Sequence, residues 1–290
     1  MSDSVSQPAP GSGRARPVSL SVIIDGRLDV ARARQVAIFA DRLGLAGVWV
    51  RRPWWPLGVP GLSDQDAAGL LAWLADGARV RAGLVADAGQ ADAGWPRRLA
   101  AMAAPGLAVA LSGEPADVSR WQRLIGQQPG LDAAPLALPA AASVPPGPGI
   151  APATAIFIPC LPGRDLSAEV TAAARAAAGR PVLAEVTVSV GRTRAEARAR
   201  ADADGLFAVV GHPDRHGLFG TLEECQATAS RLAHAGVTEL ACYLPLAADL
   251  HDVLAQLRSI AVGASVLRPG DAPSAAPPPP AGWGGRQVTA

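Results

Sequence analysis

The sequence predicts an α/β fold, specifically a (β/α)8 TIM barrel in which helices surround eight parallel strands. Two observations carry this prediction: a strand-helix-strand unit opens the chain at residues 18–50, and a similar unit closes it at residues 221–260. Between them, short apolar runs alternate with segments of helical period over a length of ~250 residues, which is typical of such barrels. Strand-helix-strand units form right-handed crossovers between parallel strands.

The opening unit is built from two strands and one amphipathic helix. Residues 19–24 are a short run rich in β-branched and leucine side chains, and the turn pair Asp25-Gly26 follows them. From Val30 to Leu43 apolar residues recur at three- and four-residue spacing, which places them on one face of a helix. Residues 46–50 are apolar almost throughout, as expected for a strand buried on both sides.

The closing unit repeats this pattern. Thr221 and Glu224 have the spacing of a capping box, in which a hydroxyl and a carboxylate close the first turn of a helix. The helix is expected to end at Gly236. A strand at 238–244 and a last amphipathic helix at 249–260 follow.

The remaining elements complete a set of eight strands. We expect helices at 64–76, 95–104, 115–125, 167–178 and 193–204, and strands at 79–85, 107–111, 136–138, 153–158 and 181–190. Residues 139–152 contain too many prolines for a helix, so one or more helices in the middle of the barrel should be shortened or missing. We assign residues 17–267 to the barrel, and residues 1–16 and 268–290 to disordered tails rich in proline and glycine.

The amino-acid composition limits the classes of molecule that this protein is expected to bind. The net charge of +1 gives no general attraction to nucleic acid or to membranes, and no apolar stretch is long enough to span a bilayer. The N-terminus has no apolar signal region, which favours a cytoplasmic location. The three cysteines lack metal-ligand spacing, so we expect buried thiols and no metal site. A small-molecule substrate is the expected partner.

The chain contains no lysine, because all of its 26 basic residues are arginines. Schiff-base aldolases, pyridoxal-phosphate enzymes and P-loop proteins all require a lysine amine. These classes are therefore excluded.

Three segments carry a resemblance to a known family. The LSVIID start and FADRLGLAGVWV finish of the opening unit, together with RVRAGLV at residues 79–85, resemble the first three strands of luciferase-like monooxygenases. Residues 216–245, HGLFGTLEECQATASRLAHAGVTELACYLP, resemble the C-terminal segment of the same family. The match covers the two ends of the chain well and its middle poorly.

This resemblance implies an oxidoreductase that binds a deazaflavin (coenzyme F420) or FMN at the C-terminal ends of the strands. The cofactor performs hydride transfer or oxygenation, and the protein holds and shields it. Barrels of this family often pair through helices of the first half of the chain, which implies a homodimer or a heterodimer with a related barrel. Many relatives place a histidine or an acidic residue after the second strand. This chain has Arg51-Arg52-Pro53-Trp54-Trp55 there, so the catalytic residue stays unassigned.

The candidate cofactor-binding residues follow the ends of strands, where barrel active sites are built. Arg51 and Arg52 are suited to pairing with a phosphate or carboxylate, and Trp54 and Trp55 to forming a wall for a planar ring. The alternative is a loop that only caps the barrel mouth.

Three further strand ends supply cofactor-binding candidates. Ser112 and Gly113 would let backbone N–H groups approach a phosphate, or would form a plain turn. Cys160 would line the pocket or be a structural thiol. Asp25 would bond a ligand or simply stabilise the turn at Gly26.

His212 and His216 are the candidate substrate-binding residues, since a histidine near the mouth can donate a proton. A solvated connector is the alternative for this loop. A second function also stays open: a non-catalytic barrel that serves as a partner subunit or scaffold. A deep polar mouth favours the enzyme, whereas a mouth filled by Trp54, Trp55 and their neighbours favours the scaffold.

Overall fold

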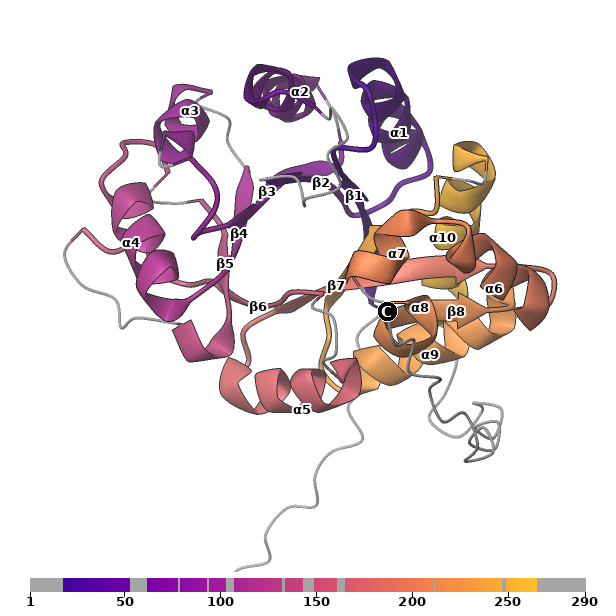
Figure 1. The fold of residues 1–290 in the computed structure, drawn as a ribbon. Coiled ribbons are helices and arrows are strands. Elements are labelled where there is room, and N and C mark those ends of the chain that lie inside the picture. The colour runs from indigo at the N-terminus through magenta and orange to yellow at the C-terminus, as the bar shows by residue number, and fades with distance from the viewer. Residues whose placement is uncertain are drawn as a thin grey trace, which may run out of the picture.

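Figure 1 shows the computed structural model as a ring of helices around a central sheet. The structure describes residues 18–52, 62–77, 79–92, 94–102, 107–131, 134–142, 149–160, 165–210, 212–246 and 249–264. Within this part of the chain, no helix is long and apolar enough to cross a membrane.

Eight strands close into a parallel barrel. They are β1 (Ser19–Ile24), β2 (Gly47–Arg52), β3 (Arg81–Asp87), β4 (Ala108–Ser112), β5 (Leu136–Leu138), β6 (Ala155–Ile158), β7 (Val182–Val190) and β9 (Glu239–Tyr243). Each of β1 to β6 pairs with the next strand along the chain, β6 pairs with β7, β7 with β9, and β9 closes the barrel on β1. The predicted (β/α)8 fold is confirmed.

Helices cover the outside of the barrel (Figure 1). They are α1 (Val30–Arg42), α2 (Asp64–Gly77), α3 (Trp95–Ala101), α4 (Pro115–Gly126), α5 (Leu166–Ala177), α6 (Arg194–Asp202), α9 (Leu222–His234) and α10 (Leu250–Ala264). Between β5 and β6 the described residues form only a 3-10 turn, at Ala140–Ala142. This agrees with the proline-rich sequence there, which predicts a missing helix.

The predicted capping box of the closing unit is present, and a second helix has a threonine cap. The Thr221 side chain accepts a hydrogen bond from the backbone of Glu224, and the Glu224 carboxylate accepts one from the backbone of Thr221. Thr193 caps α6 in the same way by accepting from the backbone of Glu196. These caps fix where two helices begin at the C-terminal face of the barrel.

The segment around His212 and His216, for which the sequence left a solvated connector as the alternative to a substrate-binding loop, contains regular secondary structure. It contains the short helices α7 (Gly205–Val210) and α8 (Pro213–His216) and the extra strand β8 (Gly217–Gly220). β8 pairs with Thr187–Val190 at the C-terminal end of β7, where only Thr187 also pairs with β9 and none of the four pairs with β6. A side chain at Gly217 would place its Cβ 1.7 Å from the carbonyl oxygen of Thr187, so this pairing requires glycine. Elements this short show no readable period in the sequence.

Strand residues alternate between two buried regions. In β4, Val109 and Leu111 belong to the core between sheet and helices, whereas Ala108 and Ala110 belong to the cluster inside the barrel. Because successive side chains of a strand point to opposite faces, every strand contributes to both regions. The barrel interior also contains charged side chains, which form the candidate site.

Candidate functional site

One polar group of the barrel interior lies at the N-terminal end of the barrel and centres on Glu239, at the start of β9. Its carboxylate accepts hydrogen bonds from the Ser21 hydroxyl and from Trp49 Nε1 at 3.0 Å, and it pairs with Arg81. The Trp49 ring lies directly on Gly83, where an added Cβ would come within 2.3 Å of the ring. A cavity of about 260 Å³ opens beside this group at the N-terminal end of the barrel. In barrels of this kind that end serves stability rather than catalysis.

A second polar group centres on Glu185 of β7 and lies toward the C-terminal end of the barrel. Glu185 is fully buried and forms a salt bridge with Arg51, which comes from β2. The Tyr243 hydroxyl donates to one carboxylate oxygen of Glu185 at 3.0 Å. The backbone N–H of Cys160 donates to the other oxygen at 3.0 Å. One carboxylate thus joins three strand ends, those of β2, β6 and β9.

Burial and charge set the protonation states of this group. Burial alone would lower the pKa of Arg51, but the neighbouring Glu185 carboxylate raises it above its ordinary value. Burial raises the pKa of the Tyr243 hydroxyl and of the Cys160 thiol, and the Glu185 carboxylate adds to both effects. At neutral pH the group therefore holds a guanidinium, a phenol and a thiol.

One donor of this group has no acceptor among the residues that the structure describes. The Nε–H of Arg51 is buried and makes no hydrogen bond within the part of the chain that the structure describes. Buried polar groups are nearly always hydrogen-bonded, so an orphaned donor of this kind points to a missing partner.

A third polar group centres on Arg27 and connects the end of β1 to the segment that follows α6. Arg27 pairs with Asp25 at 2.7 Å and with Asp204, and it donates to the backbone oxygen of Leu244 at 2.8 Å. Asp204 in turn accepts from the backbone N–H groups of Leu206 and Leu246 at 3.0 and 2.9 Å. This network fixes the start of α7 against the ends of β1 and β9.

Helix α7 covers part of the barrel interior. Leu206 and Phe207 are each only 1% exposed, and they belong to the same buried cluster as Phe157, Cys160 and Tyr243. Two apolar side chains from outside the barrel therefore fill space next to the Glu185 group.

The structure separates the two arginines that the sequence places together. Arg51 points into the barrel, whereas Arg52 donates to the backbone oxygen of Leu62 at 2.6 Å and pairs with Asp64 at the start of α2. Adjacent strand residues face opposite sides, so these two side chains cannot bind one ligand together. Trp54 and Trp55 lie outside the described residues, so their assignment stays a prediction.

The other strand-end candidates have these positions. Ser112 is buried, and its hydroxyl lies 3.5 Å from the backbone oxygen of Ala86. Gly113 has φ +118°, which favours glycine, and it packs against Asp87. Asp25 is bound by Arg27, and the Cys160 thiol lies beside the Glu185 group. Their roles toward a cofactor stay predictions.

The two histidines lie near β8 rather than in the Glu185 group. His212 caps α8; its ring nitrogens lie 2.7 Å from Asp214 and 3.1 Å from Asp202, and its ring packs against Phe219. His216 is buried, and burial lowers its pKa. Substrate binding by either residue stays a prediction.

Sequence reasoning missed Glu185 and Tyr243 as site residues, and it missed Arg27 and Trp49 as parts of the interior. A signal for Glu185 was present: it is the only charged residue in the apolar run 182–190. A charge inside a strand that is buried on both sides needs a partner, and such pairs often mark functional sites.

No protein-family profile matches the chain, and no curated protein sequence matches it either. Solved structures do. An F420-dependent secondary alcohol dehydrogenase, solved with an F420–acetone adduct, has a TM-score of 0.65 and 11% identity over 86% of this chain and 99% of its own.

Two further structures are similar. The coenzyme F420-dependent tetrahydromethanopterin reductase from Methanopyrus kandleri has a TM-score of 0.58 and 10% identity over 84% of this chain and 98% of its own. The oxygenating constituent of 3,6-diketocamphane monooxygenase from Pseudomonas putida, a type II Baeyer–Villiger enzyme in complex with FMN, has a TM-score of 0.53 and 12% identity over 86% of this chain and 98% of its own. At these identities the similarity shows the shared barrel fold.

Proposed function

We propose that this chain is a luciferase-like oxidoreductase that uses a deazaflavin or FMN at the C-terminal mouth of its barrel. Hydride transfer to, or monooxygenation of, a small organic substrate is the proposed reaction. The main support for this proposal combines the family resemblance of the sequence with the positions of the resembling segments in the barrel. The two end segments that resemble this family form the adjacent strands β9, β1 and β2 of the barrel. Solved barrels of similar extent include two F420-dependent enzymes and an FMN-binding monooxygenase.

The described residues include groups that suit the ring of such a cofactor, once the side chains that cover them move aside. The ring carries carbonyl oxygens, and the Arg51 Nε–H is a buried donor without an acceptor among the described residues. Phe157 and Tyr243 are aromatic side chains of the buried cluster inside the barrel. Arg27, Arg51 and Arg52 are each already paired with a carboxylate, so none of these three is free to bind the phosphate group of the cofactor. We assign no residue to the phosphate.

When bound, the cofactor supplies the redox chemistry, and the protein supplies position and shielding. Glu185 holds the guanidinium of Arg51 and the hydroxyl of Tyr243 in fixed positions. The raised pKa of Tyr243 keeps the proton on its hydroxyl oxygen at neutral pH. Leu206 and Phe207 exclude water from this end of the interior.

A specific observation favours the second candidate, a non-catalytic barrel that acts as a partner subunit or scaffold. Leu206 and Phe207 occupy space beside the Glu185 group, and a ligand that reaches Arg51 Nε has to displace side chains that now cover it. A filled interior is what a scaffold requires, since it binds no ring there.

An equilibrium titration of the purified protein with FMN, and separately with oxidised and reduced deazaflavin, tests the proposal by fluorescence. The oxidoreductase predicts saturable binding of one of them that weakens in Arg51→Ala. Arg52→Ala is the matched control, because Arg52 is the next residue of the same strand and faces away from the interior.

Two outcomes contradict the oxidoreductase. Absence of binding by a well-folded protein favours the scaffold, and so does binding that both arginine variants weaken equally. A Phe207→Ala variant adds a further test, since removal of this cover should strengthen binding if the ring site lies beneath it.

A further inference from the structure

A single carboxylate attaches helix α7 to the mouth of the barrel. Asp204, which is only 7% exposed, precedes α7 and accepts a hydrogen bond from the backbone N–H of Leu206 at 3.0 Å. The same carboxylate pairs with Arg27 and accepts from the backbone N–H of Leu246 at 2.9 Å. Asp204 therefore caps the first turn of α7 and also connects that turn to the ends of β1 and β9.

Arg27 is held in place without Asp204. Its Nη2 donates to Asp25 at 2.7 Å and to the backbone oxygen of Leu244 at 2.8 Å, and its Nε donates to Asp25 at 3.0 Å. Two carboxylates share this one guanidinium, so the departure of Asp204 would leave Arg27 and Asp25 as a compensated pair. Separation of α7 from the barrel thus avoids the large cost of an unpaired buried charge.

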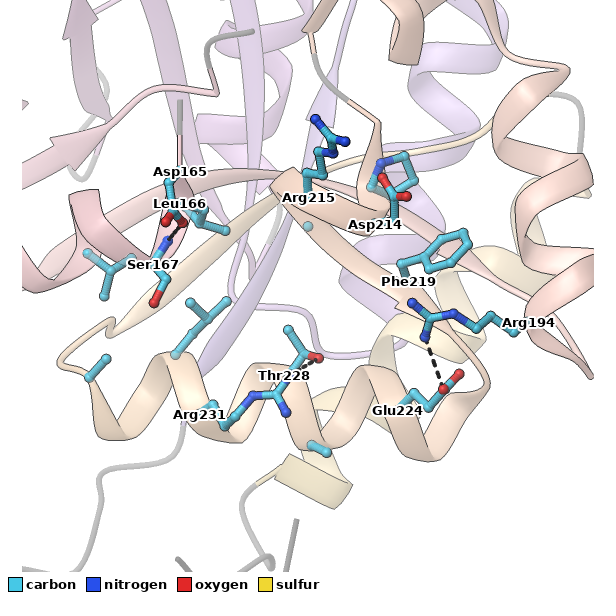
Figure 2. Close-up of a pocket in the computed structure, with 16 residues that line it drawn as sticks. Asp165, Leu166, Ser167, Arg194, Asp214, Arg215, Phe219, Glu224, Thr228 and Arg231 are labelled. Carbon is cyan, nitrogen blue, oxygen red and sulfur yellow. Dashed lines mark hydrogen bonds and ion pairs between the residues drawn. The ribbon is translucent and has the colours of Figure 1, made fainter. Parts of the chain in front are cut away.

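The chain that follows α7 is anchored by separate contacts. Arg198 of α6 pairs with Asp214 of α8 at 2.9 Å. Figure 2 shows the outer side of this anchor, where Arg194 of α6 pairs with Glu224 of α9 beside Phe219 of β8. These ion pairs do not involve the carboxylate that holds α7. A displacement of α7 therefore does not require α6, α8 or β8 to move.

Helix α7 covers polar groups as well as apolar ones. Leu206 and Phe207 belong to the same buried cluster as Cys160, whose backbone N–H donates to Glu185. Beside them lies the Nε–H of Arg51, a buried donor that has no acceptor among the described residues. A buried donor without an acceptor points to a partner that is absent while the interior is closed.

We propose that α7 is a displaceable cover over the Glu185 group, and that the ion pair between Asp204 and Arg27 is the latch that keeps it closed. Gly205, the first residue of α7, is the hinge, because it is exposed and has open space around it among the described residues. The cover and its latch depend only on these contacts, whereas the purpose of opening, access of a ligand to the cofactor site, rests on the proposed function.

The thiol of Cys160 reports whether the cover is open. Cys160 belongs to the cluster under α7, whereas Cys225 and Cys242 belong to the core between sheet and helices. The test treats the full-length protein with N-ethylmaleimide and measures the labelling rate of each cysteine by mass spectrometry of its peptides. We expect Asp204→Asn to raise the rate at Cys160 roughly ten- to hundredfold, because a charge-assisted hydrogen bond of the latch is lost.

The matched control is Asp202→Asn. It removes the same charge two residues earlier, where Asp202 is exposed and pairs with His212, so the rate at Cys160 should not change. In the Asp204→Asn background, Gly205→Ala should slow the labelling again, because alanine restricts the hinge. An unchanged rate in that double variant would refute Gly205 as the hinge.

Two results overturn the cover. An unchanged rate at Cys160 in Asp204→Asn would mean that α7 is fixed packing. Equal acceleration at Cys160, Cys225 and Cys242 would mean that the whole protein unfolds instead of α7 alone.

Titration of the same variants with FMN and deazaflavin separates this proposal from the proposed function. If the cover competes with the cofactor, Asp204→Asn should bind the cofactor more tightly than wild type. Faster labelling of Cys160 without binding of either cofactor supports the cover and contradicts the oxidoreductase. Cofactor binding with an unchanged labelling rate supports the oxidoreductase and overturns the cover.

Discussion

Arg51 and Glu185 form a salt bridge across the barrel interior, with side chains that are 3% and 0% exposed. They lie 134 residues apart in the chain. Taking two charges out of water is costly, so the pair persists only because each charge compensates the other and because Tyr243 and Cys160 supply further hydrogen bonds.

Glu185→Gln should therefore destabilise the protein strongly. The substitution keeps the size of the side chain but leaves the buried guanidinium without a counter-charge, which costs ~3–5 kcal/mol. Urea unfolding followed by circular dichroism measures the change. The control is Asp64→Asn, which breaks the more exposed pair with Arg52 and should cost at most about 1 kcal/mol. Equal effects of the two substitutions would show that the interior pair is not desolvated as described.

A double substitution separates the charge from the packing. Arg51→Met combined with Glu185→Leu removes both charges and keeps the interior filled. Buried pairs replaced by apolar residues are often neutral, so the double variant should be more stable than Glu185→Gln. A double variant that unfolds as easily as the single one would contradict this account. The readout is the same urea midpoint.

Gly83→Ala should destabilise the N-terminal end of the barrel. Its new Cβ would lie 2.3 Å from the Trp49 ring, which also holds the hydrogen bond to Glu239. Overpacking of this kind costs ~1–3 kcal/mol and should change the intrinsic tryptophan fluorescence. Gly69→Ala is the matched control: Gly69 lies on α2 with open space around its Cα, so alanine there should stabilise by ~0.5–1 kcal/mol. A Gly83→Ala protein as stable as wild type would refute the close contact.

The three cysteines should be unreactive in the folded protein. Cys160, Cys225 and Cys242 are buried and free, and burial raises the pKa of each thiol, that of Cys225 to about 12. A thiol reacts as its thiolate, so Ellman's reagent at pH 8 should label none of them natively. In denaturant the same assay should report all three. Fast labelling of one thiol in the native protein would show that its site opens to solvent.

His216 should make stability fall at mildly acidic pH. Burial and the neighbouring Arg215 lower its pKa below the ordinary value of 6.5, although Asp214, Glu169 and Asp165 oppose this. The unfolded chain then binds a proton at a higher pH than the folded chain. Stability is full above pH 6.5 and decreases as the pH falls toward the lowered pKa of the folded state.

The measurement is the unfolding free energy of wild type and His216→Gln between pH 7.5 and about pH 5. The wild-type protein should lose stability faster than the variant over this range. Parallel curves would contradict the lowered pKa. His234→Gln is the control for other histidines, because His234 is an exposed residue of α9.

The barrel and most of its helices and strands could be predicted from the amino-acid sequence alone. Apolar spacing in 18–50, the capping box at Thr221 and Glu224, and the prolines of 139–152 are local signals, and each produced the element, cap or missing helix that the structure contains. Such signals act over a few residues, within which spacing decides which side chains share a face. The loop expected around His212 and His216 instead contains a helix and a strand that are too short to show a period in the sequence.

The contacts between polar residues, in contrast, follow from how the barrel closes and could not be predicted from the sequence. Arg51 and Arg52 are neighbours in sequence, yet closure of the barrel turns one toward Glu185 and the other toward Asp64. Glu185, Tyr243 and Cys160 come from different strands, so no spacing along the chain reveals their contact. Closure of a sheet brings distant residues together, and that information lies in the pairing of strands rather than in any one of them.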